Sequence, residues 1–450
     1  MSLLRIFAFL SAFTFILKIG YSQQETELNL KHVINNAVKS NSSVVKLQNS
    51  IEGQQSVIKS QYGNLFPSLS FTAGWTRTNQ VTQGVYTFNG ITFNTDPQNE
   101  TSNNYNLSLR SDVTLFDGFT NYESIDVAKM TEVNLYTQME SVKQNIVLNV
   151  LNNYVAVLKN NQIVAINTGS LEDSRAQLEK IKLFVEAGKR TRSDVYRQDV
   201  QVAQNELAVE QAKNNLEKSI ADLVYTARLP QDKTYTVNLN EFNINVPYET
   251  MEAYVTQNSN IDPLINNAFK NRYDYKSSLQ NLVIYESNLE IARNSLIFPT
   301  LSGFGSYSLS GKRIKNIDDS RVFTVGLTLS YPIFQGFSIE NQRQQALVNY
   351  KSANEDVKEL KDQIALEIKK AVLDLKSLLK QIEITQRNII SAEQDKFSAE
   401  ESYRVGLGTL LEIQTATTNY NNLLIEKSNL IYNFLLAQKQ LEYYQGLLKY

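Results

Sequence analysis

Few side chains in this sequence could carry out covalent or acid–base chemistry. Its 450 residues include no cysteine and a single histidine, His32. The lack of cysteine excludes disulfides, thiolate metal sites, a cysteine nucleophile and a lipid anchor on an N-terminal cysteine. His32 lies in an amphipathic stretch rich in lysine and asparagine, where a solvated or capping histidine is the simpler interpretation. Because a nucleophile elbow, a metal-ligand spacing and a phosphate-binding loop are also missing, we predict no enzyme, no metal and no cofactor.

Two acidic residues occupy equivalent positions at the start of two expected helices. Asp194 and Glu412 each stand three residues after a threonine, Thr191 and Thr409. Thr409 with Glu412 has the pattern of a capping box and Thr191 with Asp194 nearly has it, so both acids could serve only to start a helix. The short segments before them are expected to be turns between antiparallel helices, in which the glycines allow the reversal. The turn residues are Gly188, Lys189 and Arg190 in the first segment, whose bases could contact an acidic partner or be solvated, and Gly406, Leu407 and Gly408 in the second.

The composition favours an ordered, exported protein. Hydrophobic residues make up 42% of the chain and charged residues 20%, and the mean hydropathy is −0.31. The net charge of −2 provides no field that would attract nucleic acid. Residues 1–22 read as a secretory signal peptide, with Arg5 before an apolar run and small residues up to Ser22. Since this run is shorter than the roughly 20 residues of a membrane span, we expect cleavage and not a retained anchor.

The chain contains an internal duplication. The motif Phe-Asp-Gly-Phe at 116–119 returns as Phe-Gln-Gly-Phe at 334–337, a shift of 218 residues. The turns at Gly188 and Gly406 are related by the same shift. Upstream, Phe-Pro-Ser-Leu-Ser at 66–70 matches Phe-Pro-Thr-Leu-Ser at 298–302 with a shift of 232. The difference is taken up by the polar segment 79–104, which reads as a long hairpin loop. The expected organisation is a signal peptide (1–22), a first repeat (23–229), a connector (230–259) and a second repeat (260–450).

Each repeat shows the same order of expected elements. Four segments alternate apolar and polar residues as strands do, with Phe304 as an exception, and have the length of a tilted membrane-crossing strand. These segments are 67–77, 104–117, 299–310 and 322–334. Helical stretches are expected at 28–65, 119–228, 262–297 and 338–449, and the two long ones contain no proline. From Gly118 to Gly188 and from Gly336 to Gly406 the distance is 70 residues, which a helix spans in about 100 Å.

These elements together restrict the architecture. A lipid-exposed sheet cannot keep open edges, and four strands are too few to close a barrel, so several chains must pool their strands. This reasoning alone leaves a dimer, a trimer and a tetramer open. The apolar face of the strands would meet lipid, whereas the polar face, which carries Arg110 and Asp112, suits a water-filled lumen. A soluble sandwich is the alternative, but it leaves the long helices without a role. The predicted fold class is therefore mostly α with a membrane β-barrel portion.

The ordered set of motifs resembles the TolC-like outer-membrane efflux proteins over nearly the whole mature chain. The resemblance rests first on the helix expected from Leu28 to Asn41 and on the paired Phe-Pro-Ser/Thr-Leu-Ser strands. It rests also on the turns at Gly118 and Gly336, which lead into long helices, and on the tips of the two helix hairpins. It implies a homotrimer with a 12-stranded barrel in the outer membrane of a Gram-negative bacterium and an α-helical tunnel in the periplasm. The implied function is a passive, gated exit duct in efflux or type I secretion. An inner-membrane transporter of the RND or ABC type would supply the energy, and a periplasmic adaptor would dock at the tips.

The resemblance also implies roles for single residues. Acidic side chains of the second tip ring the closed constriction in this family, and Glu412 matches the first such position while the second falls on Thr415. Tyr403 and Asp194 match residues that latch neighbouring helix pairs, whereas the basic latch partner falls on Gly408. We therefore expect the closed state to be held differently in this chain.

A second function class is a periplasmic coiled-coil adaptor or scaffold without a membrane barrel. The four alternating segments discriminate between the two classes, because an adaptor has no need of lipid-facing apolar strands.

Overall fold

The computed structural model describes residues 26–94, 96–239, 241–242 and 244–449. The expected signal peptide at 1–22 lies outside this range. Contacts divide the chain into two compact units, each built from separate segments. The first unit comprises Met1–Lys46, Met139–Tyr273 and Lys361–Tyr450, and the second comprises Leu47–Gln138 and Asp274–Leu360.

The helices confirm the duplication to the residue. Helices α4 (Thr120–Glu186) and α9 (Ser338–Arg404) have 67 residues each, and α5 (Arg192–Thr226) and α10 (Leu410–Tyr444) have 35 each. Every end is displaced by the same 218 residues. Uninterrupted by proline, α4 and α9 each run for about 100 Å. The first unit buries apolar side chains of these helices, including Tyr154, Leu158, Leu223, Leu375, Phe434 and Leu441.

Two of the expected helices are each broken once, which corrects the prediction. The segment expected at 28–65 forms α2 (Leu30–Ser40) and α3 (Ser42–Gly63), and that expected at 262–297 forms α7 (Ile261–Asn271) and α8 (Tyr273–Ile297). The breaks lie at Asn41 and Arg272, both with extended backbone. The Asn41 side chain accepts a hydrogen bond from the backbone N–H of Ser43 at 2.8 Å, which caps the new helix.

The break at Arg272 is held by a buried ion pair in the first unit. Arg272 Nη1 lies 2.6 Å from Glu367 Oε2, and the two side chains are 8% and 23% exposed. The same nitrogen also donates to the carbonyl of Tyr444. The pair therefore connects the start of the second repeat to α9 and to the end of α10.

Removal of this buried pair is expected to destabilise the first unit. In Arg272→Ala the Glu367 carboxylate loses its cation in a largely buried place, a change that costs about 3 kcal/mol. The exposed pair Arg343–Glu340, at 2.6 Å, is the matched control, and Arg343→Ala should cost below about 1 kcal/mol. Thermal unfolding followed by helical circular dichroism compares the two variants. Equal midpoints would show that burial of the Arg272 pair does not contribute to stability.

The expected connector has secondary structure of its own. Strand β6 (Tyr235–Val237) pairs in parallel with β1 (Thr26–Leu28), and α6 (Tyr248–Gln257) buries Met251 and Val255. The Tyr154 hydroxyl donates a 2.6 Å hydrogen bond to the carbonyl of Asn238. The connector is therefore packed onto the helices of the first unit.

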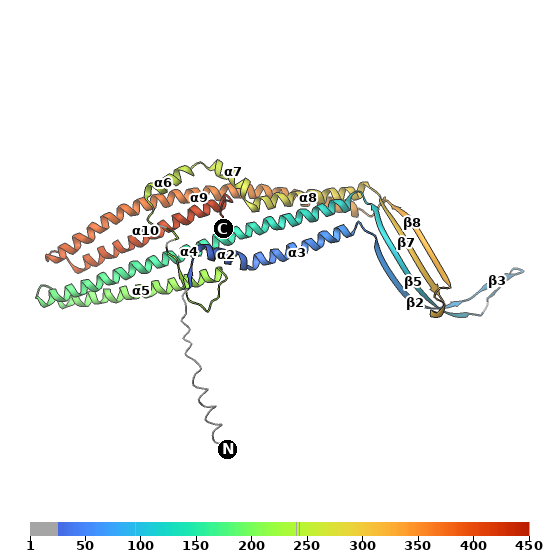
Figure 1. Ribbon diagram of the computed structural model, residues 1–450, viewed down its shortest axis with the longest axis horizontal. Coiled ribbons are helices and arrows are strands. Elements are labelled where there is room, and N and C mark those ends of the chain that lie inside the picture. Colours follow the sequence, from blue (N-terminus) through green and yellow to red (C-terminus); the bar gives the residue numbers. More distant parts are fainter. Residues whose placement is uncertain (1–25, 95, 240, 243, 450) are drawn as a thin grey trace, which may run out of the picture. The chain divides into compact units, whose positions relative to one another are not determined.

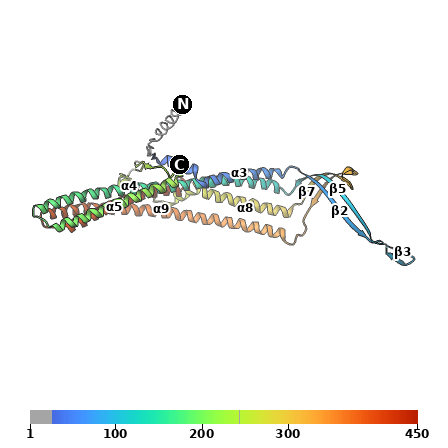
Figure 2. The ribbon, with the colours of Figure 1, turned by 90° about the horizontal axis from the view of Figure 1, so that it is seen from below.

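The second unit carries a four-stranded antiparallel sheet in the order β2-β5-β7-β8 (Figures 1 and 2). Its strands are β2 (Ser68–Thr82), β5 (Gln98–Phe116), β7 (Thr300–Gly311) and β8 (Ser320–Ser330). The two repeats meet where β5 pairs with β7. Helices α3 and α8 lead into β2 and β7, and α4 and α9 follow β5 and β8, so all four join the sheet at one end. Across the part of the chain that the structure describes, no helix is both long and apolar enough to span a membrane.

The segment expected to be a long loop is mostly strand. Pairing of β2 with β5 continues to Thr82 opposite Gln98, beyond the expected ends at 77 and 104. Past this point β3 (Val85–Phe88) and β4 (Ile91–Asn94) form a second hairpin, closed by Asn89 and Gly90 with φ of 49° and 80°. Asparagine and glutamine have low strand propensity, but pairing with a partner strand overrides it.

Candidate functional site

One face of the sheet is apolar and exposed. Residues directly opposite each other in antiparallel strands share a face, and the row Phe71, Leu109, Tyr307 and Phe323 crosses all four strands. The other large apolar residues on this face include Leu69, Trp75, Val325, Leu327 and Leu329. On β8 these side chains are between 67% and 73% exposed. So large an apolar surface on a single chain indicates a face that lies against lipid or protein.

Aromatic residues bound this face at both ends. At the end where the helices join, Phe116 and Phe119 meet edge to face at 5.6 Å, and Phe334 and Phe337 repeat the contact at 5.5 Å. Phe66 and Phe298, at the same end, are also exposed. At the other end Trp75 stacks on Tyr105 at 6.5 Å.

The distance between these aromatic ends fits a membrane. From Phe66 to Trp75 the extended chain covers about 30 Å. A strand tilt of about 40° reduces this to roughly 23 Å, close to the ~25 Å apolar band of outer-membrane barrels. Aromatic girdles at both interfaces are typical of such barrels.

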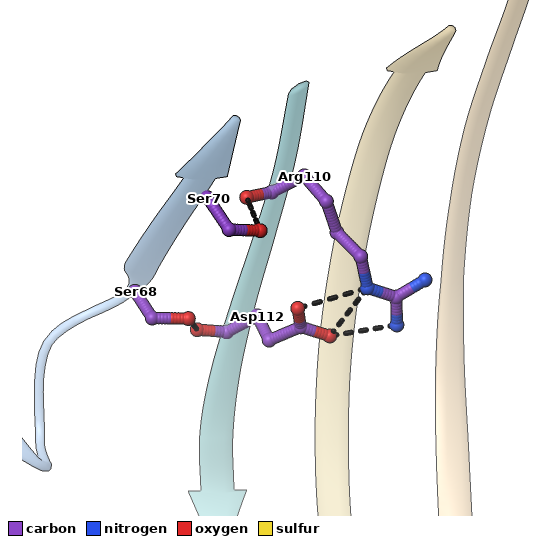
Figure 3. Close-up of polar contacts among 4 residues, drawn as sticks. All are labelled: Ser68, Ser70, Arg110 and Asp112. Atoms are coloured by element: carbon purple, nitrogen blue, oxygen red, sulfur yellow. Dashed lines mark hydrogen bonds and ion pairs between the residues drawn. The ribbon is translucent and has the colours of Figure 1, made fainter. Parts of the chain in front are cut away.

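The opposite face of the sheet is polar and carries the predicted pair Arg110 and Asp112 (Figure 3). These residues stand two apart on β5, so their side chains project from the same face, and Arg110 Nη2 lies 2.7 Å from Asp112 Oδ1. The hydroxyls of Ser68 and Ser70 donate to the carbonyls of Asp112 and Arg110 at 3.2 and 3.3 Å. Both charged side chains are nearly half exposed, so the face presents a locally neutralised, solvated pair.

Phe304 interrupts the alternation because it belongs to the polar face. It lies directly opposite Asp112 on one side and Gly326 on the other. The Arg110 guanidinium sits over its ring, 4.6 Å from the centroid. A Cβ at position 326 would lie 2.9 Å from the ring, so glycine leaves the room that the ring needs. The aromatic ring thus supports the arginine on the polar face.

The predicted turn glycines at the strand-to-helix junctions adopt the left-handed conformation together with their neighbours. Gly118 and Phe119 have φ of 68° and 66°, and Gly336 and Phe337 have φ of 59° and 64°. Two successive left-handed residues make a tight turn between strand and helix. The Asp117 carboxylate accepts the backbone N–H of Asn121 at 3.0 Å, which starts α4.

The two turn glycines provide a matched pair of substitutions. A Cβ at Gly118 would lie 2.8 Å from the Cβ of Phe298, whereas one at Gly336 would meet nothing within 4 Å. Alanine at either position carries the left-handed cost of about 1–2 kcal/mol, and Gly118→Ala adds overpacking of about 1–3 kcal/mol. We expect a lower thermal midpoint for Gly118→Ala than for Gly336→Ala. A lower midpoint for Gly336→Ala would contradict the close packing of Gly118 against Phe298.

Both predicted capping boxes are present at the helix tips. The Glu412 carboxylate accepts the backbone N–H of Thr409 at 2.9 Å, and the Thr409 hydroxyl accepts the backbone N–H of Glu412 at 3.3 Å. The Asp194 carboxylate accepts both the backbone N–H and the hydroxyl of Thr191, at 3.4 and 3.3 Å. The turn glycines Gly188 and Gly406 have φ of 70° and 91°. Asp194 and Glu412 therefore cap the starts of α5 and α10.

The tips of the two helix hairpins are joined through Tyr403. Its side chain is 2% exposed and packs with Ile181, Leu410 and Ile413. Arg190 of the first tip stacks on the Tyr403 ring, 3.9 Å from its centroid, and donates to the Tyr403 carbonyl. Within the described part of the chain the buried Tyr403 hydroxyl has no hydrogen-bond partner. Burial, with a smaller effect of Asp194, raises the pKa of Tyr403.

The remaining tip residues divide into exposed and buried positions. Lys189, Leu407 and Thr415 are exposed, with Leu407 at 88%. Gly408 is buried, and a Cβ there would lie 3.0 Å from the Cβ of Ser402 and 3.1 Å from a carboxylate oxygen of Glu412. A long basic side chain at this position would be crowded, and the basic side chain that contacts Tyr403 is Arg190 of the other hairpin.

Further contacts between the hairpins carry no signal in the sequence. Gln198 is 3% exposed, donates to the carbonyl of Ser174 at 2.9 Å and accepts from Gln414 at 3.2 Å. Lys396 lies 3.2 Å from Asp173. These residues line a polar cavity of about 250 Å³ between the hairpins. A buried glutamine within an α-helical repeat cannot be told from a surface one by its spacing.

A family model described as "Outer membrane efflux protein" matches residues 33–225 and 264–447. The chain belongs to this family. Among curated relatives it is similar to outer membrane protein TolC of Salmonella enteritidis, with 24% identity covering 95% of this chain and 84% of that protein. TolC of Escherichia coli K12 is 22% identical, with 93% and 82% covered.

Solved channels share the fold. The Campylobacter jejuni CmeC outer membrane channel superposes with a TM-score of 0.73 at 17% identity, covering 93% of this chain and 85% of that one. The Vibrio cholerae outer membrane protein VceC gives a TM-score of 0.73 at 16% identity, covering 93% and 96%. An outer membrane efflux protein of this fold is a channel and an outer-membrane protein of Gram-negative bacteria, as the sequence predicted. The alternative of an adaptor without a membrane portion is wrong.

Proposed function

We propose that three copies of this efflux protein share one 12-stranded barrel and act as a passive, gated exit duct. The observation that carries the proposal is the sheet itself. Among the described residues, no strand pairs with the outer edge of β2 or of β8, and an open edge is not tolerated in lipid. Four strands per chain reach a closed, water-filled barrel only when copies combine. The family relationship favours three copies over two or four.

The polar face of the sheet would line the lumen of this barrel. Arg110 and Asp112 would then repeat around the wall as neutralised pairs supported by Phe304. A wall of hydroxyls and paired charges carries no strong net field, which suits the passage of varied solutes. The apolar face with its aromatic ends would meet lipid.

The long helices would form the periplasmic tunnel, with the tips as its inner end. A periplasmic adaptor would dock at the tips, and an inner-membrane transporter of the RND or ABC type would supply the energy. The exposed Lys189 and Leu407 offer a cation and an apolar contact for such docking. Glu412, Asp194, Thr415 and Tyr403 would belong to the gate.

Conductance of the purified protein in planar lipid bilayers tests the proposed duct. We expect stepwise currents of one defined unit size, because each oligomer contributes one pore. The variant Tyr403→Ala, in which the tip contacts are weakened, is recorded as well, because a natural channel that is fully closed at rest would carry no current. Membrane-inserted oligomers that carry no current in either form would contradict a conduit.

A further inference from the structure

The β3–β4 hairpin is the largest difference between the two repeats on the sheet. It extends the β2–β5 pair at the end opposite the four helices (Figures 1 and 2). In the second repeat the corresponding connection between β7 and β8 is a short turn with one 3₁₀ segment, Ile314–Asn316. The first repeat therefore presents an additional element at this end of the sheet.

The hairpin is amphipathic. Tyr86 pairs with Phe93, and Phe88 pairs with Ile91, so these four side chains share one face. The other face is more polar and carries Thr87 opposite Thr92 and Val85 opposite Asn94. Tyr86 stacks on Phe93 at 5.2 Å, yet all four apolar side chains remain between 41% and 68% exposed. An isolated two-stranded hairpin is marginally stable in water, so this face requires a cover.

The hydrocarbon of the membrane is too far away to be that cover. The apolar band of the sheet ends at Trp75 and Tyr105. Beyond it, the residues from Thr76 to Thr82 extend β2 by about 23 Å. This spacer is polar and includes Arg77, paired opposite Asn103, with Glu100 opposite Gln80 on the partner strands. Charged and amide side chains in such a row belong outside the lipid core.

The same hairpin in the neighbouring chains of the proposed oligomer could cover this apolar face. From Thr78 to Asn94 the sequence contains no charged residue, so identical hairpins do not repel each other. Aromatic side chains that face one another gain contact energy beyond the area they bury. The hairpin also continues the edge strand β2, the strand that must pair with a neighbouring copy in the proposed oligomer.

We propose that the β3–β4 hairpins of one oligomer pack their apolar faces together and cap the outer end of the barrel. The inference rests on the proposed oligomer and adds to it a second constriction, formed by the β3–β4 hairpins. The cap would be held by apolar contact alone and would yield to a solute arriving from inside.

Single cysteines test this packing, because the natural chain has none. Phe88→Cys lies on the apolar face, and its neighbour Thr87→Cys on the opposite face is the matched control. Intact cells expressing either variant are treated with a short, membrane-impermeant bis-maleimide. We expect a crosslinked dimer on a denaturing gel for Phe88→Cys, several-fold above the yield for Thr87→Cys.

Two further measurements make the outcome decisive. Native mass spectrometry of the same variants reports the oligomer, and a polar monofunctional maleimide reports thiol accessibility. An intact oligomer with equal or absent crosslinking at both positions would overturn the cap and leave the duct standing. If Phe88→Cys also resists the polar maleimide, lipid or another molecule covers the face instead. A monomeric protein would overturn the cap together with the duct.

Discussion

Replacing Leu327 by arginine is expected to prevent stable assembly in the outer membrane. Leu327 lies in the middle of β8 between Phe323 and Tyr331, and its side chain is 70% exposed on the apolar face. An arginine at the bilayer midplane of a barrel costs about 2–4 kcal/mol. In a shared barrel the cost is incurred once per copy, so the total is comparable to the whole stability of a typical domain. The measurement is the amount of folded, heat-modifiable oligomer in the outer-membrane fraction.

The adjacent residue supplies the control. Thr328 lies on the opposite, polar face of the same strand, directly opposite Ser302. Thr328→Arg adds the same charge to a wet lumen and is expected to leave assembly nearly unchanged. Equal assembly of both variants would show that the apolar face does not meet lipid.

Truncation of Arg190 is expected to open the channel. Arg190→Ala removes the stacking on Tyr403 and the hydrogen bond to its carbonyl, two of the contacts that hold the first hairpin tip to the second. Together these contacts contribute about 2 kcal/mol. If opening requires the tips to part, the ratio of open to closed channels rises about 30-fold in each chain. Single-channel recording gives this ratio directly.

Lys189→Ala is the control for charge, because Lys189 is the neighbouring base and is exposed. Tyr403→Phe separates the ring from the hydroxyl. The hydroxyl is buried and has no partner among the described residues, so this variant should keep the closed population of the natural chain. An Arg190→Ala channel as closed as Lys189→Ala would remove Arg190 from the gate. An open Tyr403→Phe channel would assign the latch to the hydroxyl.

The sequence predicted the duplicated architecture well, because constant spacing is a strong signal. The shift of 218 residues found from Gly118 and Gly336 reappears at both ends of α4 and α9. The absence of proline from the long stretches is also what an uninterrupted helix requires. The resemblance to efflux proteins followed from the same ordered motifs and is confirmed by the family match.

The predictions that were wrong involve local signals that tertiary contacts override. The helix breaks at Asn41 and Arg272 fall at residues that are neither proline nor glycine. Arg272 is extended where the partly buried carboxylate of Glu367 binds it, and that partner lies 95 residues away. The polar extension of β2 resembled a loop because its asparagine and glutamine residues have low strand propensity.

Side-chain partnerships across the fold could not be predicted. Phe304 broke the alternation of its own strand, and only the register with Gly326 and Arg110 explains its place. Arg190 and Tyr403 are 213 residues apart. The gate roles of Glu412 and Thr415 stay predictions.

The mass of the assembled protein shows whether three chains share one barrel. The protein is extracted from the outer membrane in mild detergent, and its protein component is weighed by native mass spectrometry. We expect three times the mass of the mature chain, as a shared 12-stranded barrel requires. A monodisperse monomer, or protein recovered only from the soluble periplasm, would contradict it.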